Sequence, residues 1–310
     1  MQIIRRGFVL AVLACLSLLS FATEKVRSGV PALKVTAPTG HVSILMGSIH
    51  VGVAGLRQPD ARVFDGMKRY VIEHVASEGP AVEAPRPAAE ALARLSETGK
   101  LGRAAWATDL SDRELEGLKE RLVCNGILPA STAESGVEWL LALERPITAE
   151  AIAIRRCSPR NLLSRDTILA GYVADRKIPV FGLEVNSEVE SRRLAVDDRT
   201  YVHNIRIAMT DLQARAMVTA TRAVDVGDYD TVLLILQRLA ANEEDFAKFQ
   251  RLMIDDRNEA WMPKLVQYLD EGNAFVNVGA AHIAGKKGLV SLLKARGYRV
   301  EPMQLPVSSH

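Results

Sequence analysis

Two Gly-x-x-His elements at opposite ends of the sequence are the residues best suited to chemistry. One runs from Gly47 to His50 and the other from Gly279 to His282. Each follows a run of apolar, strand-forming residues, and a glycine at the end of a strand lets the backbone turn tightly. An imidazole three residues later can bind a metal ion or act as a general base near neutral pH. For either histidine alone, the alternative is a hydrogen-bonded loop residue.

The segments around the two elements share one predicted order: strand, Gly-x-x-His, helix and strand. We expect strands over residues 42–46, 81–84, 274–278 and 298–302, with helices over 62–77 and 287–296. Such βαβ units build parallel sheets, and functional groups collect at the carboxyl ends of parallel strands. Both histidines are therefore expected in one pocket at that edge of a shared sheet.

The middle of the chain is rich in Ala, Leu, Glu and Arg at helical spacing, which predicts a helical insertion over roughly residues 85–176. Ser111 and Glu114 have capping-box spacing ahead of a helix that ends near Cys124. We expect one more core strand, over residues 180–183, and further helices over residues 148–156, 161–175, 203–224, 229–239, 243–253 and 257–269. The predicted fold class is α/β, with a mixed, largely parallel central sheet formed from both chain ends and flanked by helices.

The first 22 residues resemble a Sec-type signal peptide. Arg5 and Arg6 precede an apolar run over residues 7–19, and small residues stand at −3 and −1 of a cleavage site between Ala22 and Thr23. The run is shorter than the ~20 residues of a spanning helix, although an uncleaved anchor is the alternative. We therefore expect a periplasmic or secreted protein, with one domain over residues 23–310 and no membrane segment in the mature chain.

Export changes how the cysteines are interpreted. Cys15 ends a Val-Leu-Ala-Cys sequence similar to a lipoprotein processing site, but the apolar run continues past it, so lipidation is the lesser alternative. Cys124 and Cys157 remain, and in an oxidising compartment they either pair as a disulfide or stay as two buried thiols.

The composition argues against disorder and against nucleic-acid binding. The chain has 310 residues, 48% of them hydrophobic and 25% charged, which is enough apolar material for a globular core. Formal net charge is only +2 and aromatic residues make up 5%, so no basic, aromatic-rich surface is expected.

Four motifs, in order, resemble the TraB/GumN family, whose relatives include the Tiki proteases. The family's two signature ends correspond to ILMGSIHVG at residues 44–52 and FVNVGAAHIAGKKGLVSLLKARGYRVEPM at residues 275–303. Its Gly-Leu-Glu segment corresponds to VFGLEVNSE at residues 180–188, and its Arg-Asn-x-x-x-Trp helix to DDRNEAWMPKL at residues 255–265. One departure follows Glu184, where the family commonly has a glutamine and this chain has Glu-Val-Glu.

The resemblance implies a site made of His50, His282, Glu83 and Arg257, with Asn258 and Glu184 nearby. Glu83 is preferred as the site carboxylate because it lies in a predicted strand. Glu73 and Glu78 are alternatives nearer the family's usual spacing, but Glu73 falls inside a predicted helix. The alternative for Arg257 is that it forms an ion pair at the protein surface. Trp261, one helical turn later, is expected in the core.

The resemblance also implies a function. Relatives are regarded as metal-dependent proteases, and two histidines with one carboxylate leave a metal position open for water. We expect an exported hydrolase acting on a peptide or protein, with His50, His282 and Glu83 holding a divalent ion such as Mn, Co or Zn. A non-catalytic peptide-binding protein, an accessory factor of polysaccharide biosynthesis and an esterase without metal are the alternatives. The chain has no His-Glu-x-x-His and no Gly-x-Ser-x-Gly motif.

Overall fold

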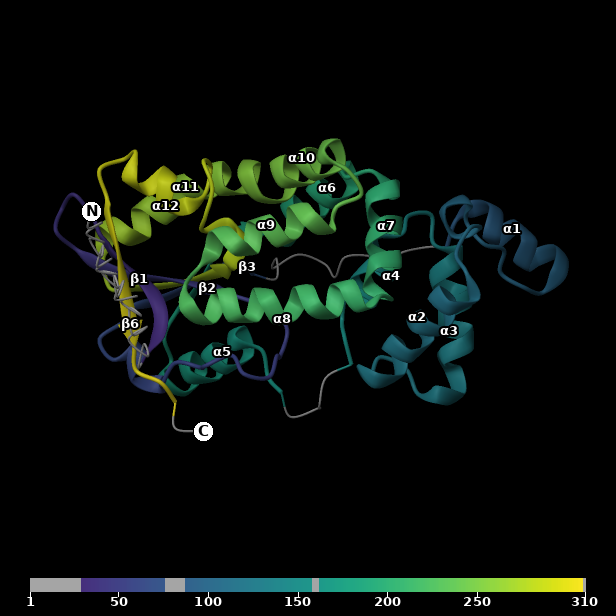
Figure 1. Ribbon diagram of the computed structural model, residues 1–310, viewed down its shortest axis with the longest axis horizontal. Coiled ribbons are helices and arrows are strands. Elements are labelled where there is room, and N and C mark those ends of the chain that lie inside the picture. Colours follow the sequence, from purple (N-terminus) through teal and green to yellow (C-terminus); the bar gives the residue numbers. More distant parts are fainter. Residues whose placement is uncertain (1–28, 76–86, 158–161, 309–310) are drawn as a thin grey trace, which may run out of the picture.

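Strands from both chain ends form one six-stranded sheet (Figure 1). The structure, a computed structural model, describes residues 29–75, 87–157 and 162–308. In space the strands follow the order β4, β3, β5, β2, β1 and β6. Their bounds are Val30–Thr36 (β1), Val42–Ser48 (β2), Arg69–Val75 (β3), Val180–Val185 (β4), Ala274–Gly279 (β5) and Arg299–Leu305 (β6).

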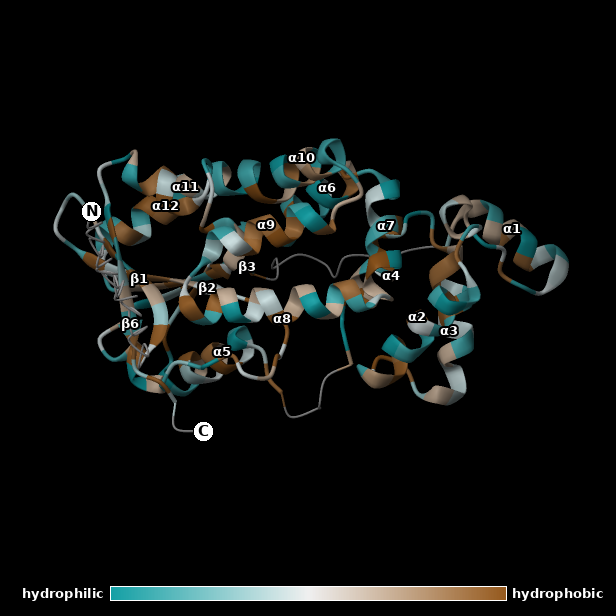
Figure 2. Ribbon diagram, viewed as in Figure 1, coloured by the Kyte–Doolittle hydropathy of each residue, from teal (hydrophilic) through white to brown (hydrophobic). Residues whose placement is uncertain are grey.

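Helices connect the strands. They are α1 (Ala89–Thr98), α2 (Asp112–Cys124), α3 (Ala133–Ala142), α4 (Ile147–Ala153), α5 (Arg165–Arg176), α6 (Asn186–Ala195), α7 (Asp198–Ala208), α8 (Asp211–Val226), α9 (Tyr229–Leu239), α10 (Glu243–Gln250), α11 (Asp256–Glu271) and α12 (Leu289–Lys294). Short 3-10 turns are η1 (Ala61–Phe64), η2 (Ala105–Ala107), η3 (Ala130–Thr132) and η5 (Ala280–His282), and η4 (Arg251–Asp255) is a π-helix. Along α8 and α9, hydrophobic and hydrophilic residues alternate as in helices with one buried face (Figure 2).

The sheet is mixed and largely parallel. Strands β4, β3, β5 and β2 run parallel to one another, whereas β1 is antiparallel to both β2 and β6. The predicted α/β class is therefore confirmed. Every residue of β5 is buried, as expected for a parallel strand covered on both faces. Because parallel strands end at the same edge, the segments that follow β2, β3, β4 and β5 lie along one edge of the sheet.

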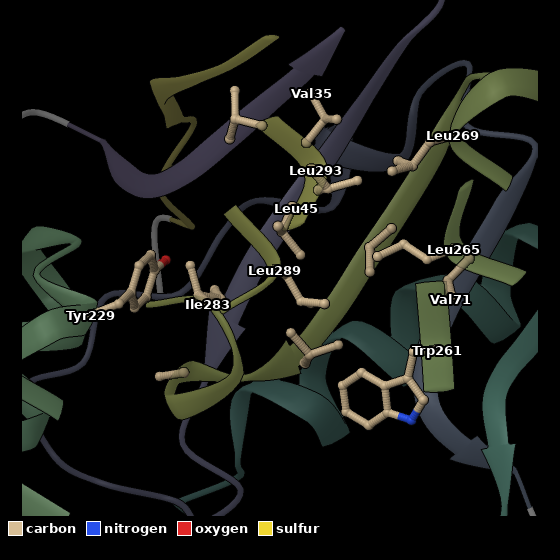
Figure 3. Close-up of a cluster of buried hydrophobic side chains, with 14 of the residues drawn as sticks. Val35, Leu45, Val71, Tyr229, Trp261, Leu265, Leu269, Ile283, Leu289 and Leu293 are labelled. Carbon is tan, nitrogen blue, oxygen red and sulfur yellow. The ribbon is translucent and has the colours of Figure 1, made fainter. Parts of the chain in front are cut away.

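Helices cover both faces of this sheet. On one face, Trp261 and Leu265 of α11 and Leu289 of α12 belong to a cluster of buried side chains that includes residues of the strands (Figure 3). On the other face, Leu169 of α5 belongs to a second cluster, with Phe275 of β5. The expectation that Trp261 lies in the core is confirmed. Helices α1, α2 and α3 lie away from the sheet, at the opposite end of the molecule in Figure 1.

The helix predicted over residues 62–77 is wrong, because the chain there makes the turn η1 and then strand β3. Gly66 has a φ of +79°, a left-handed conformation that an α-helix does not contain. Residues 70–72 are Tyr-Val-Ile, the aromatic and β-branched types that favour strands. The strand predicted over residues 81–84, with Glu83, lies outside the described residues.

Three other elements differ from the prediction. Strand β1 was not predicted, since Pro31 near its start weakens the strand pattern. The helix predicted over residues 203–224 is two helices, α7 and α8, because Thr210 between them adopts an extended conformation. The helix predicted over residues 243–253 ends at Gln250, where the π-helix η4 begins.

Cys124 and Cys157 form a disulfide, which decides between the two alternatives left open for this pair. Ser111 and Glu114 make the predicted capping box at the start of α2. In the part of the chain that the structure describes, no helix has the length and apolar character needed to cross a bilayer. The predicted signal peptide, residues 1–22, lies outside the described residues.

Candidate active site

The two Gly-x-x-His elements meet at the carboxyl edge of the sheet. Strands β2 and β5 are direct neighbours, and Ser48 pairs with Gly279 in their register. Between the two histidines lies Glu73, whose Oε1 is 3.4 Å from His50 Nε2 and 3.8 Å from His282 Nε2. Both imidazoles therefore face the same carboxylate oxygen, so the structure brings the two histidine elements together at one edge of the sheet.

Glu73 is held in place by a backbone amide and an arginine. Its Oε1 accepts a hydrogen bond from the Gly279 amide at 2.6 Å, and its Oε2 accepts one from Arg257 Nη2 at 2.7 Å. Burial alone would raise the pKa of this carboxyl, but His50 and Arg257 outweigh it and hold the pKa well below its usual range. Glu73 is therefore an ionised carboxylate at the centre of the pocket.

Gly279 is needed for this approach. A Cβ atom at this position would lie 2.8 Å from His50 Nε2 and 3.0 Å from Glu73 Oε1. The glycine of the second element thus lets the backbone pass close to the two groups that a side chain would push apart.

Arg257 is buried in the first turn of α11 and connects two carboxylates. Its Nε and Nη2 donate to Glu184 Oε1 at 2.8 Å and 2.5 Å, and Nη2 also donates to Glu73. Burial lowers the pKa of the guanidinium, but Glu73 and Glu184 outweigh that effect and raise it. Arg257 is therefore a fixed positive charge inside the pocket, not a surface ion-pair partner.

A π-helix immediately before α11 helps to aim this arginine. Nη1 of Arg257 donates to the carbonyl of Met253, within η4, at 3.1 Å. π-Helical segments are rare and occur often at functional sites. The guanidinium also lies over the Trp261 ring, 4.8 Å from its centroid.

Asn258 determines the tautomer of His282. Its Nδ2 donates to the carbonyls of His282 and Lys287 at 3.1 Å and 2.9 Å, so its Oδ1 is the atom that faces His282 Nδ1, at 2.8 Å. Nδ1 therefore carries the proton, and Nε2 presents a lone pair towards Glu73. Burial lowers the pKa of His282 to about 3, so the ring is neutral.

His50 lies on the open side of the pocket. Its side chain is 58% exposed, and its Nδ1 is 3.3 Å from Asp166 Oδ1 while Nε2 faces Glu73. The carboxylates of Asp166 and Glu73 raise the pKa of His50 above its usual range. Solvent at the exposed ring weakens both contacts, so they orient the imidazole more than they stabilise the fold.

Asp166 is a site residue that the sequence did not reveal. It lies in the first turn of α5 and accepts hydrogen bonds from Ser48 Oγ at 2.5 Å and Asn277 Nδ2 at 2.9 Å. No motif marks it, and the available signals were indirect: the polar Ser48 and Asn277 within otherwise apolar strands.

Glu73 Oε1 lies at the spacing of two metal ligands from both His50 Nε2 and His282 Nε2. Two ligands of a tetrahedral ion with bonds of 2.0–2.1 Å lie about 3.4 Å apart. The distances from Glu73 Oε1 to the two Nε2 atoms, 3.4 Å and 3.8 Å, are close to that value. His282 Nε2 also lies 3.2 Å from Arg257 Nη1, and its one lone pair can accept from the guanidinium or bind an ion, but not both.

A second group of ligand atoms lies beside the first. Among the described residues, Glu73, His74 and Glu184 offer ligand atoms that all lie within 4.8 Å of one another. Arg257 already donates to both carboxylates, so its guanidinium supplies the positive charge of that group. Arg257 also contacts His282 Nε2, so it competes with a metal ion in both sets, and what distinguishes His50, Glu73 and His282 is that they join the two histidine elements.

Most of the residues predicted for the site lie together. His50, His282, Arg257, Asn258 and Glu184 form one connected network of hydrogen bonds and close contacts. Glu83 and Glu78 lie outside the described residues, and Glu73 occupies the position expected for the site carboxylate. Glu73 was set aside because it was assigned to a helix, whereas strand β3 brings it to the edge of the sheet.

Comparisons with curated proteins and with solved structures find no match. A family model described as the TraB/PrgY/gumN family matches residues 32–302. That match covers nearly the whole chain, including both histidine elements and the arginine helix, and the chain therefore belongs to the TraB/PrgY/gumN family.

Proposed function

We propose that this chain is an exported, metal-dependent hydrolase that cleaves peptides at the pocket between His50, Glu73 and His282. The observation that carries the proposal is the approach of two imidazole Nε2 atoms to one carboxylate oxygen, at 3.4 Å and 3.8 Å. Two histidines and a carboxylate are a common ligand set of hydrolytic zinc sites, where an open position is left for water. Membership of the family agrees with this reading.

The residues of the site have separate roles in the proposed reaction. His50, Glu73 and His282 would hold a divalent ion, which lowers the pKa of a bound water and polarises a carbonyl. Asn258 keeps the His282 lone pair directed at that position, and the Gly279 amide fixes the Glu73 carboxylate.

Two further residues support attack by water. Arg257 Nη1 lies 3.2 Å from His282 Nε2, so its charge borders the place where a carbonyl oxygen would become negative. Glu184 Oε2 is buried and has no hydrogen-bond partner among the described residues. It is the carboxylate oxygen left to carry a proton from the attacking water to the leaving amine.

The disulfide supports the proposed location. Disulfides persist in oxidising compartments and are rare in the cytosol, and Cys124 is bonded to Cys157. Fractionation of cells that express the full chain tests this part. A mature protein in the periplasm or medium that begins at Thr23 is the expected result, and an uncleaved chain in the cytosol is the contrary one.

Activity is tested with mature protein stripped of metal and then resupplied with Mn²⁺, Co²⁺ or Zn²⁺. We expect cleavage of a peptide library to return with one of these ions and to be lost in His50→Ala and His282→Ala. His41→Ala is the matched control, because His41 is exposed and its Nδ1 contacts Thr39 and the Asp270 carbonyl, which are not residues of the candidate site. Cleavage no greater than that of His50→Ala with every ion would contradict the proposal.

One observation favours a second candidate, a hydrolase that needs no metal. Arg257 Nη1 lies within hydrogen-bond distance of His282 Nε2 and so uses the lone pair that an ion would require. Full activity in the presence of a chelator would select this candidate. Capture of an intact peptide without cleavage would instead indicate a binding protein.

A further inference from the structure

A cavity of about 480 Å³ borders the candidate active site. Val51 and Gly52, the two residues that follow His50, form part of its wall, and Leu162 forms another part four residues before Asp166. His50 and Asp166 contact each other at 3.3 Å. Two wall segments therefore lead directly into the site, and we name this space the His50-loop cavity.

The wall formed by the loop after His50 is tightly packed. A Cβ atom at Gly52 would lie 1.9 Å from the Leu162 carbonyl oxygen, so the backbones of the two wall segments are in close contact. A glycine is required for that approach. The loop after His50 is therefore packed directly against the segment at Leu162.

Aliphatic side chains form most of the lining. Val51, Val53, Ile154, Met217 and Val218 all face this space. Ile154 is 42% exposed and Val218 is 52% exposed, although both are large aliphatic residues. Ligand pockets are typically concave and apolar, with a few polar groups that fix orientation. A hollow of this kind fits a bulky aliphatic side chain.

The charged residues of the lining leave a positive excess. Arg156, Arg222 and Asp225 contribute to the wall. Asp225 is paired with Arg57, whose Nε lies 2.9 Å from Oδ2. Within the described residues, neither Arg156 nor Arg222 has an ion-pair partner. Two uncompensated guanidiniums attract a carboxylate, which they can bind in a bidentate manner.

We propose that the His50-loop cavity is the substrate subsite, and that it selects peptides with a bulky aliphatic residue beside the cleaved bond and a carboxylate next to that residue. This inference rests on the proposed function, because it assigns a substrate class to the same site. The carboxylate can be an acidic side chain or the C-terminus of a short peptide, and the test separates the two.

Binding is measured first, with metal-free wild-type protein and fluorescent peptides, so that no cleavage is required. We expect a Leu-Glu peptide to bind on the order of tenfold more tightly than Ala-Glu, the factor that ~1.4 kcal/mol gives, and the same loss in whichever of Leu-Gln and C-terminally amidated Leu-Glu lacks the recognised carboxylate. Comparison of free and amidated C-termini then identifies which carboxylate is used. Equal affinity for all these peptides would overturn the inference.

Variants test whether the cavity itself is responsible. Val218→Asp should weaken binding of Leu-Glu by about tenfold, because it places a negative charge in an apolar, positively charged space. Leu234→Asp is the matched control, since Leu234 is 49% exposed on α9 and lies outside the cavity. Equal effects of the two variants would contradict the proposal.

The role of the positive charges is tested with variants of two arginines on α8. Arg222→Gln should remove most of the preference for Leu-Glu over the peptide that lacks the recognised carboxylate, whereas Arg215→Gln, also on α8 but outside the cavity, should not. In cleavage assays the Val218 and Arg222 variants should raise KM with little change in kcat.

The outcomes separate this inference from the proposed function. Selective binding without cleavage under any metal would contradict the hydrolase and leave the subsite standing. Cleavage that is unaffected by Val218→Asp and Arg222→Gln would leave the hydrolase standing and overturn the subsite.

Discussion

Asn258 Oδ1 lies 2.8 Å from His282 Nδ1, and this contact decides which ring nitrogen faces the pocket. The amide cannot rotate freely, because its Nδ2 already donates to two carbonyls. Nε2 is therefore left with its lone pair directed towards Glu73, while Trp261 packs against the ring with centroids 4.4 Å apart. The second motif thus supplies a neutral imidazole of fixed orientation, which a metal ligand requires.

Replacing Asn258 should damage the site more than the fold. In Asn258→Ala the His282 ring loses the partner that fixes its tautomer, and two carbonyls lose a donor. Partners of metal-bound histidines typically contribute 10–100-fold to metal affinity or activity, so a loss of about that size is expected. Metal titration and kcat/KM measure it, and unchanged values would show that the ring is held by other contacts.

Removing the Arg257 charge should destabilise the fold strongly. Arg257→Met leaves Glu73 and Glu184 buried without their cation, and breaking a buried ion pair costs about 3–5 kcal/mol. Urea unfolding should show that loss. A second change, Glu184→Gln, should restore part of the stability of Arg257→Met, because one unpaired charge is then removed. A double variant no more stable than Arg257→Met would contradict this account of the pair.

Asp166 is expected to position His50. In Asp166→Asn the residue keeps its shape but loses the charge that faces His50 Nδ1 at 3.3 Å. Metal affinity should fall by roughly 10-fold or more while the unfolding midpoint changes little. Asp175→Asn, an exposed residue on the same helix, is the control. Equal metal affinity in both variants would remove Asp166 from the site.

Much of the site followed from the sequence because its motifs lie directly after strands. A Gly-x-x-His element at the end of β2 and another at the end of β5 can meet only if the strands are neighbours, and the pairing of Ser48 with Gly279 makes them so. Strand patterns predict such an edge, because parallel strands end on the same side.

The rest depended on contacts between distant segments. Glu73 was assigned to a helix because its surroundings also fit a helical spacing, and pairing of β3 with β4 and β5 overrides that local preference. Asp166 lies 116 positions after His50 in the chain and reaches it only because α5 packs across the sheet. No local sequence pattern predicts a contact between residues so far apart.

Glu150 should make the stability depend on pH away from the site. Burial raises the pKa of its carboxyl, although Asn204 donates to it at 3.0 Å and Arg193 also lowers the pKa. A carboxyl group whose pKa is higher in the folded state than in the unfolded state stabilises the fold when it is protonated. That contribution is complete below the unfolded pKa of about 4.3 and is lost as the pH rises through the folded pKa.

Glu150→Gln should therefore raise the melting temperature at pH 7 by about 2–4 °C, the shift that ~1 kcal/mol gives in a protein of roughly this size. The difference from wild type should shrink as the pH falls towards 4. Calorimetry at several pH values measures it, and a difference that is constant with pH would contradict a buried, charged Glu150.

The central claim is that His50, Glu73 and His282 form one centre, and metal stoichiometry tests it most directly. Mature protein titrated with Mn²⁺, Co²⁺ or Zn²⁺ should bind one ion per chain, and that ion should be lost in His50→Ala, Glu73→Gln and His282→Ala but retained in His41→Ala. Unchanged stoichiometry and affinity in the three site variants, or no binding by the wild type, would contradict it.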